Sequence, residues 1–164
     1  MLAEAVFDLI FCVSAFHHFA DKQESLARAA QTLRSSGMLA IIGMDPHTGQ
    51  DNWGLYHCFE GTREADLARC PSAESVQNWM TEAGLADVMS GIADRIVYSL
   101  TGWEVLQPPF LQTGVTSQLA LLTKKAYTAG LERTKADLLQ EEKAGRPLEF
   151  AVDVSLSLVT GRAP

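Results

Sequence analysis

Two apolar runs near the N-terminus flank a segment with helical periodicity. Residues Val6 to Val13 (VFDLIFCV) are almost continuously apolar, and residues Met38 to Met44 (MLAIIGM) form a second such run. Runs of this kind predict strands that are covered on both faces in a parallel sheet. Between them, Asp21 and Glu24 form a capping-box pattern, and apolar residues then recur at helical spacing as far as Gly37. This order predicts a βαβ unit and therefore an α/β fold.

The rest of the chain predicts further helices and strands. Helices are expected from Ser72 to Gly84 and from about Thr123 to Ala144, because apolar residues share one helical face in each segment. A strand is expected near Asp94 to Leu100, and another from Leu148 to Leu158, where apolar and polar residues alternate. Irregular stretches are expected at residues 45–71, with one short helix, and at residues 101–118, which contain Pro108 and Pro109.

Composition narrows the class of protein. With 164 residues, 47% of them apolar, the chain is expected to fold as one domain over residues 1–164. Its 13 basic and 20 acidic residues give a net charge of −7 without a Lys/Arg block, so neither nucleic acid nor membrane is an expected partner. Three cysteines without paired spacing and no secretory signal predict a reducing, cytoplasmic setting. The four histidines show no zinc-binding spacing, so no metal is expected.

Residues 7–46 (FDLIFCVSAFHHFADKQESLARAAQTLRSSGMLAIIGMDP) carry a resemblance to a known family. They are similar to the segment of class I S-adenosylmethionine-dependent methyltransferases that spans the fourth strand, the next helix and the fifth strand. Residues 72–88 (SAESVQNWMTEAGLADV) resemble the helix before the sixth strand, and the terminal strand resembles the seventh. The resemblance implies a partial Rossmann-like methyltransferase sheet, with strands equivalent to 4-5-7-6, an antiparallel last strand and flanking helices.

The chain departs from this family where the family binds its cofactor. That site uses a Gly-x-Gly-x-Gly turn after the first strand, and none of the twelve glycines here forms even a Gly-x-Gly pair. The usual Pro-Gly-Gly turn before the fifth strand appears as Ser35, Ser36 and Gly37. The resemblance therefore implies a truncated domain that lacks the N-terminal cofactor-binding half. Such a domain would bind S-adenosylmethionine only if another part completed the site. Whether the chain is an enzyme stays open.

Candidate site residues follow the two N-terminal strands. Parallel sheets place ligands at the carboxyl ends of their strands. The resemblance implies that Ser14, Ala15 and Phe16 line the cofactor pocket and that His17 or His18 approaches the substrate; the alternative is a polar cap on a tight turn. Asp45 and His47 follow the second strand and could act as acid or base, or could form a solvated turn. Aromatic residues could wall a substrate pocket or seal a core; they are Trp53, Tyr56 and Phe59.

The same resemblance leaves the strand at Val6 to Val13 on an open sheet edge. This strand is apolar and is not guarded by Pro or Lys. An edge of this kind tends to pair with another chain, and a two-fold copy of itself is the simplest partner. We therefore expect a homodimer through residues 6–13. The alternative is a different polypeptide that supplies the lost half and restores the cofactor site, with a small molecule as ligand.

Overall fold

The computed structural model describes residues 5–107, 111–112 and 116–164, which form two compact units. Pro108 and Pro109, part of the predicted irregular stretch, lie outside the described residues. The expectation of a single domain stays a prediction. Unit 1 comprises Met1–Gly49, Arg69–Arg95 and Ser155–Pro164, and unit 2 comprises Gln50–Ala68 and Ile96–Val154.

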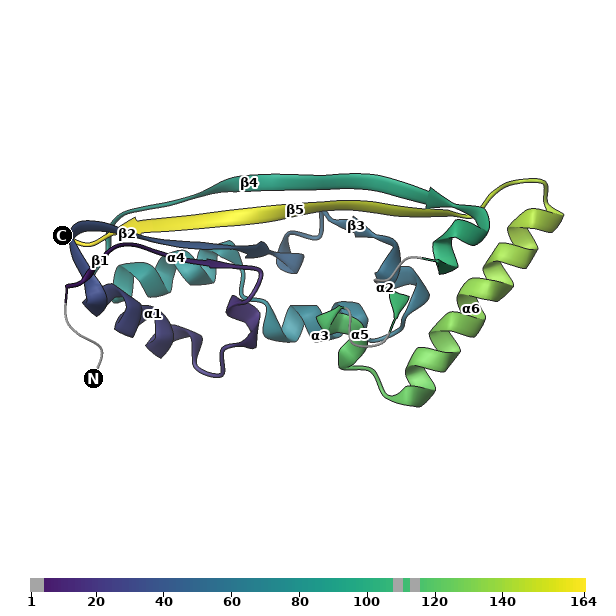
Figure 1. The fold of residues 1–164 in the computed structure, drawn as a ribbon, viewed down its shortest axis with the longest axis horizontal. Helices are drawn as coiled ribbons and strands as arrows, with labels where there is room; N and C mark the ends of the chain where they lie inside the picture. The colour runs from purple at the N-terminus through teal and green to yellow at the C-terminus, as the bar shows by residue number, and fades with distance from the viewer. Residues whose placement is uncertain (1–4, 108–110, 113–115) are drawn as a thin grey trace. The chain divides into compact units, whose positions relative to one another are not determined.

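Unit 1 begins with the predicted βαβ arrangement (Figure 1). Strand β1 (Phe7–Val13) is followed by helix α1 (Lys22–Thr32) and strand β2 (Leu33–Met44). The two strands are parallel neighbours, and their register places Phe11 beside Ala40. The prediction of an α/β fold that starts with a strand, a helix and a strand is confirmed.

Helix α1 starts where the sequence predicts and ends earlier. The Asp21 carboxylate accepts a hydrogen bond of 2.9 Å from the backbone N–H of Glu24, which satisfies one of the free N–H groups of the first turn. The helix ends at Thr32 instead of continuing to Gly37, because Leu33 already pairs with Phe7 as the first residue of β2. The extra strand residues are mostly polar, so the apolar pattern alone does not reveal them.

The remaining elements of unit 1 complete its sheet. Helix α4 (Ala73–Glu82) is capped by Ser72, whose hydroxyl accepts from the N–H of Ser75 at 3.1 Å. Strand β4 (Ala86–Thr101) and strand β5 (Glu149–Arg162) are longer than the sequence predicts, and each has residues in both units. Strand β5 runs antiparallel to β2, and β4 pairs with β5. The order β1-β2-β5-β4 therefore confirms the predicted 4-5-7-6 arrangement with its antiparallel last strand.

Helices α1 and α4 lie on the same face of the unit 1 sheet (Figure 1). Buried side chains from both helices and from β2 and β5 make one cluster there, and Ile10 and Cys12 of β1 pack against it. The buried members are Phe16, Leu26, Leu33, Leu39, Ile41, Val76, Met80, Leu85 and Val159.

The opposite face of β1 is not covered by described residues. Side chains alternate between the two faces of a strand, so Leu9, Phe11 and Val13 point away from the cluster that Ile10 and Cys12 contact. These three side chains are 53%, 66% and 48% exposed. We call them, with Phe7 at 45% exposed, the open row of β1.

Unit 2 packs its helices around two buried aromatic rings. A Cβ at Gly130 would lie 2.3 Å from the ring of Phe59, and one at Gly54 would lie 2.8 Å from the ring of Phe150. Only glycine therefore allows these close approaches. The elements are β3 (Asn52–Trp53), α2 (Gly54–Cys58), α3 (Thr62–Arg69, ending just beyond the unit boundary), a 3-10 turn at Gly102–Leu106, α5 (Ser117–Ala120) and α6 (Lys124–Lys143).

Residues 45–71 contain more regular structure than the sequence predicts. Instead of a loop with one short helix they hold a 3-10 turn at Pro46–Thr48, strand β3 and helices α2 and α3. Phe59 is fully buried, which favours its role in sealing a core, whereas Trp53 and Tyr56 are half-buried with ring centroids 5.3 Å apart. Tertiary contacts made by these aromatics, and not local periodicity, order this segment.

Candidate functional site

The candidate site lies in unit 1, where the parallel strands β1 and β2 end. The backbone N–H of Ser14 donates to the carbonyl of Ile42 at 2.8 Å, so the two strands stay paired up to their last residues. Ser14 itself has φ of 48°, a left-handed conformation that turns the chain sharply out of β1. The next residues form a 3-10 turn at Phe16–His18. This is the sheet position at which α/β proteins place their ligands.

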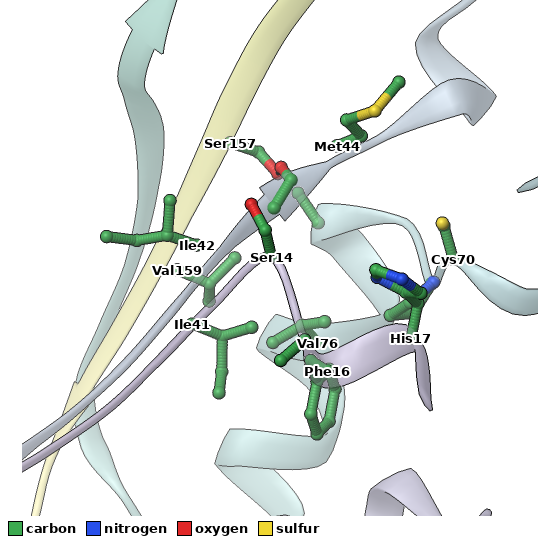
Figure 2. A pocket seen from close by; sticks show the side chains of 14 residues that line it. Ser14, Phe16, His17, Ile41, Ile42, Met44, Cys70, Val76, Ser157 and Val159 are labelled. Carbon is green, nitrogen blue, oxygen red and sulfur yellow. The ribbon is translucent and has the colours of Figure 1, made fainter. Parts of the chain in front are cut away.

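A small cavity opens at this position (Figure 2). Its walls come from the segment after β1, from the end of β2, from the start of α4 and from β5. Ser14, Ala15, Phe16 and His17 all line it, and their roles toward a cofactor or a substrate stay predictions. The volume is about 30 Å³. That volume holds roughly one water molecule, whereas small-molecule sites usually enclose about 300–1,000 Å³.

The sequence-predicted histidines differ in their relation to this cavity. His17 lines it, and His18 does not, although their ring centroids lie only 4.0 Å apart. Phe16, which is 4% exposed, packs edge-on against Phe19 with the centroids at 5.5 Å. His17 is therefore the one histidine of this pair that borders the cavity; its chemical role stays a prediction.

Asp45 and His47 tie two segments together beside the cavity without lining it. The Asp45 carboxylate, 8% exposed, accepts from the N–H of His47 at 3.0 Å and from the N–H of Ala73 at 2.8 Å. His47 Nε2 lies 2.9 Å from the carbonyl oxygen of Cys70, so this nitrogen carries the proton and donates. These bonds attach the end of β2 to the start of α4. A catalytic role for either residue stays a prediction.

Several residues around the cavity carry no motif in the sequence. Ser157 faces Gly43 in the antiparallel register of β2 and β5, and its hydroxyl donates to the Gly43 carbonyl at 2.9 Å. Only the strand register brings these two residues together. The alternation of polar residues along β5 gave the single available signal for Ser157. Other residues in this group are Met44, Cys70 and Pro71.

The cavity has no charged wall. None of its lining residues is Asp, Glu, Lys or Arg. Among the described residues, no three His, Cys, Asp or Glu side chains converge closely enough to hold a metal ion. Within the same residues, no helix is long and apolar enough to cross a membrane. The walls of this cavity alone do not fit a molecule of the size and charge of S-adenosylmethionine.

Comparison with known proteins gives a consistent fold assignment. The sequence profile of a methyltransferase domain family matches residues 1–41. A search of curated protein sequences finds no significant match. Among solved structures, a protein described as a methyltransferase of an antibiotic biosynthesis pathway from Anabaena variabilis is 20% identical, with a TM-score of 0.69. The alignment covers 98% of this chain and 68% of that protein.

Two further structures are similar at lower TM-scores. A protein described as a methyltransferase from Bacillus halodurans is 16% identical with a TM-score of 0.52, over 98% of this chain and 71% of that one. Phosphoethanolamine N-methyltransferase 2 from Haemonchus contortus, solved with S-adenosyl-L-methionine, is 14% identical with a TM-score of 0.50. The alignment spans all of this chain and 35% of the Haemonchus protein. The chain thus resembles class I methyltransferases and has the fold of one part of them.

Proposed function

We propose that this chain is a methyltransferase-like protein that is not an autonomous enzyme and that associates with a second copy of itself through β1. The observation that carries this proposal is the open row of β1. It stands on the edge strand of a methyltransferase-like sheet, beside the strand end at which the candidate cavity lies.

The cofactor part of the proposal rests on the sequence and on the size of the cavity. No two glycines of the chain are separated by a single residue, so the turn that lets a backbone approach a cofactor closely is not present in this sequence. The cavity at Ser14 has about one tenth of the smallest volume usual for small-molecule sites. We therefore expect no measurable affinity of the chain alone for S-adenosylmethionine.

The association part rests on the exposure of β1. In the described sheet β1 has β2 as its one neighbour, so its other edge offers unpaired backbone groups. The open row adds apolar side chains that are 45–66% exposed. A two-fold axis beside β1 would pair two copies antiparallel and bring both open rows to one face of a continuous sheet. Burial of that surface would stabilise the dimer.

A second candidate is an active S-adenosylmethionine-dependent small-molecule methyltransferase whose glycine-rich cofactor turn comes from a different polypeptide. The position of the cavity favours it, because Ser14, Ala15 and Phe16 line that cavity at the carboxyl end of β1. In this case the partner strand beside β1 is parallel and carries the glycine-rich turn. S-adenosylmethionine would be the cofactor only of the complex.

The cellular setting that we propose is the cytoplasm. None of the three cysteines, all of which lie in the described part of the chain, forms a disulfide. Unpaired thiols suit a reducing compartment. Fractionation of cells that express the chain with a small tag tests this location.

The first experiment combines light scattering with calorimetry on the purified chain. We expect the mass of a dimer and no heat of binding for S-adenosylmethionine or S-adenosylhomocysteine. The variant Phe11→Lys places a charge in the open row and should give a monomer. The matched control is Leu121→Lys, because Leu121 is 59% exposed but lies outside β1.

The outcomes separate the candidates. Tight binding of either cofactor by the chain alone would overturn the claim that it is not an autonomous enzyme. An unchanged dimer mass in Phe11→Lys would overturn association through β1. A monomer that gains cofactor affinity only when mixed with a polypeptide carrying Gly-x-Gly-x-Gly would favour the second candidate.

A further inference from the structure

Unit 2 contains a larger cavity that shares no residue with the one at Ser14. It has a volume of about 410 Å³ and lies between β3, α2, α6 and the first residues of β5. This volume falls within the range of about 300–1,000 Å³ that small-molecule sites occupy. Its residues come from positions 52–58 and 137–151 of the sequence, so only the fold assembles it.

The carboxylates that line this cavity make its charge negative. Asp137 of α6 and Glu149 of β5 line it, and no Lys or Arg does. Both carboxylates are exposed, and neither forms an ion pair with a described residue. The two arginines closest to them in sequence are engaged elsewhere: Arg133 pairs with Glu60 at 3.3 Å, and Arg146 with Glu141 at 3.0 Å. Two uncompensated negative charges at one cavity attract a cation.

The apolar surface of the wall comes from Leu148 and Ala151, which are both partly exposed. Close packing lies behind it, because the ring of Phe150 is 2% exposed and packs so closely on Gly54 that no larger residue fits there. A ligand that fills the cavity therefore needs an apolar body as well as a positive charge.

The cation that fits is organic and not a metal ion. No three metal-ligating side chains converge anywhere in the described residues, including His57, Cys58 and the two carboxylates here. Burial raises the pKa of the Cys58 thiol, although a hydrogen bond with Thr134 opposes this. The neutral thiol is therefore the favoured form, and only the thiolate is a good metal ligand.

We propose that the unit 2 cavity binds a small organic amine in its ammonium form, with the charge beside Asp137 and Glu149 and the apolar body against Leu148 and Ala151. His57 and Asn52 line the same cavity and can hydrogen-bond to polar groups of the ligand. This inference goes beyond the proposed function and needs neither S-adenosylmethionine nor association through β1.

The test is a titration of the full chain followed by NMR, with n-butylamine, phenethylamine and tryptamine as probes. Each amine is paired with its neutral alcohol, and 3-phenylpropionate serves as the anionic counterpart of phenethylamine. We expect saturable shifts at backbone amides of residues 52–58 and 148–151 for at least one amine below about 10 mM, a range suited to ligands of this size. The alcohols and 3-phenylpropionate should bind more weakly or not at all.

The variants Asp137→Asn and Glu149→Gln remove each charge with little change of shape. Each should weaken amine binding by about five-fold, the upper range for one partly solvated charge pair. The matched control Glu132→Gln removes a carboxylate of α6 that does not line the cavity, and it should leave binding unchanged. Thermal unfolding of all three variants checks that they fold.

Three results would overturn the proposal. They are the absence of saturation for every amine, equal binding of 3-phenylpropionate, and amine binding that neither charge-removing variant weakens. Because the calorimetric test with S-adenosylmethionine is separate, failure of the amine site and failure of the proposed function are distinguishable.

Discussion

The two faces of strand β1 differ in what covers them. On the face toward α1 and α4, Ile10 and Cys12 are partly buried against the cluster of unit 1. On the other face Leu9 and Phe11 are 53% and 66% exposed. The exposure changes between adjacent residues of β1. Phe11 lies on the open face beside Ala40, and the next residue, Cys12, lies on the covered face beside Ile41.

The comparison teaches that strand composition and strand burial are separate properties. A strand rich in apolar residues on both faces is typical of a sheet that is covered twice. Within the described residues only one face of β1 is covered. The covered face stabilises the fold of the chain itself, because burial of apolar surface contributes about 25 cal/mol per Å². The open row can contribute only when something else covers it.

The largest expected effect on stability is on the covered face. Met80 of α4 is fully buried in the unit 1 cluster, so Met80→Ala leaves a cavity there. We expect a loss of about 2–5 kcal/mol in the free energy of unfolding. Urea unfolding followed by circular dichroism measures it. A loss below about 1 kcal/mol would mean that the cluster relaxes around the gap and is less tightly packed than the structure shows.

The substitution Asp45→Ala, at the edge of the same face, should cause a smaller loss in the free energy of unfolding. This substitution leaves two backbone N–H groups, those of His47 and Ala73, without their carboxylate acceptor. We expect a loss of about 1–3 kcal/mol, because unsatisfied buried donors are costly. The control is Asp8→Ala on β1, where an exposed ion pair with Arg34 is worth no more than about 1 kcal/mol. Equal losses in the two variants would contradict the anchoring role of Asp45.

Thiol reactivity should differ between the two faces of β1. Burial raises the pKa of Cys12, and a hydrogen bond with the backbone of Ala15 lowers it less. Alkylation requires the thiolate, so its rate at Cys12 should rise with pH through a midpoint above that of an ordinary exposed thiol. In Phe11→Cys the added thiol should react several times faster than Cys12 at neutral pH in monomeric protein. Mass spectrometry of iodoacetamide adducts gives both rates, and equal rates would refute the difference in cover.

The smallest effect is expected for Phe11→Thr, which keeps a good strand former while removing the apolar ring. At a dilution where light scattering reports a monomer, the free energy of unfolding should change by less than about 0.5 kcal/mol. The side chain is 66% exposed there and has little contact to lose. A loss as large as that of Met80→Ala would show that the chain covers this face itself.

Some of the fold was predictable because local signals and packing agree. The cap at Asp21, the cap at Ser72 and the glycine after α4 all do in the structure what their sequence patterns indicate. The apolar run of β1 is a strand, and the family resemblance gave the correct sheet order. The early start of β2 was not predictable, because the polar residues at positions 34–36 lie in an irregularity of the strand pairing, between the Phe7–Leu33 pair and the Leu9–Met38 pair.

The candidate site was predictable only in part, for a similar reason. Ser14 to His17 follow a recognisable strand, so their place at its carboxyl end follows from the sequence. Asp45 also follows a strand, but its bond to Ala73 depends on a contact across 28 positions of the chain. The unit 2 cavity joins residues that are more than 75 positions apart, and no periodicity within one segment can indicate such a meeting.

The two hydrogen bonds beside the candidate cavity have a consequence for how this chain could be altered. His47 donates a hydrogen bond to the carbonyl of Cys70, and Asp45 accepts one from the N–H of Ala73. These bonds join the two ends of the segment between His47 and Cys70 within unit 1. Closing a longer loop between fixed ends costs only about 0.6 kcal/mol for each doubling of its length. The segment after Gly49 is therefore a place where added residues, or a whole inserted module, would leave the α/β framework of unit 1 able to fold.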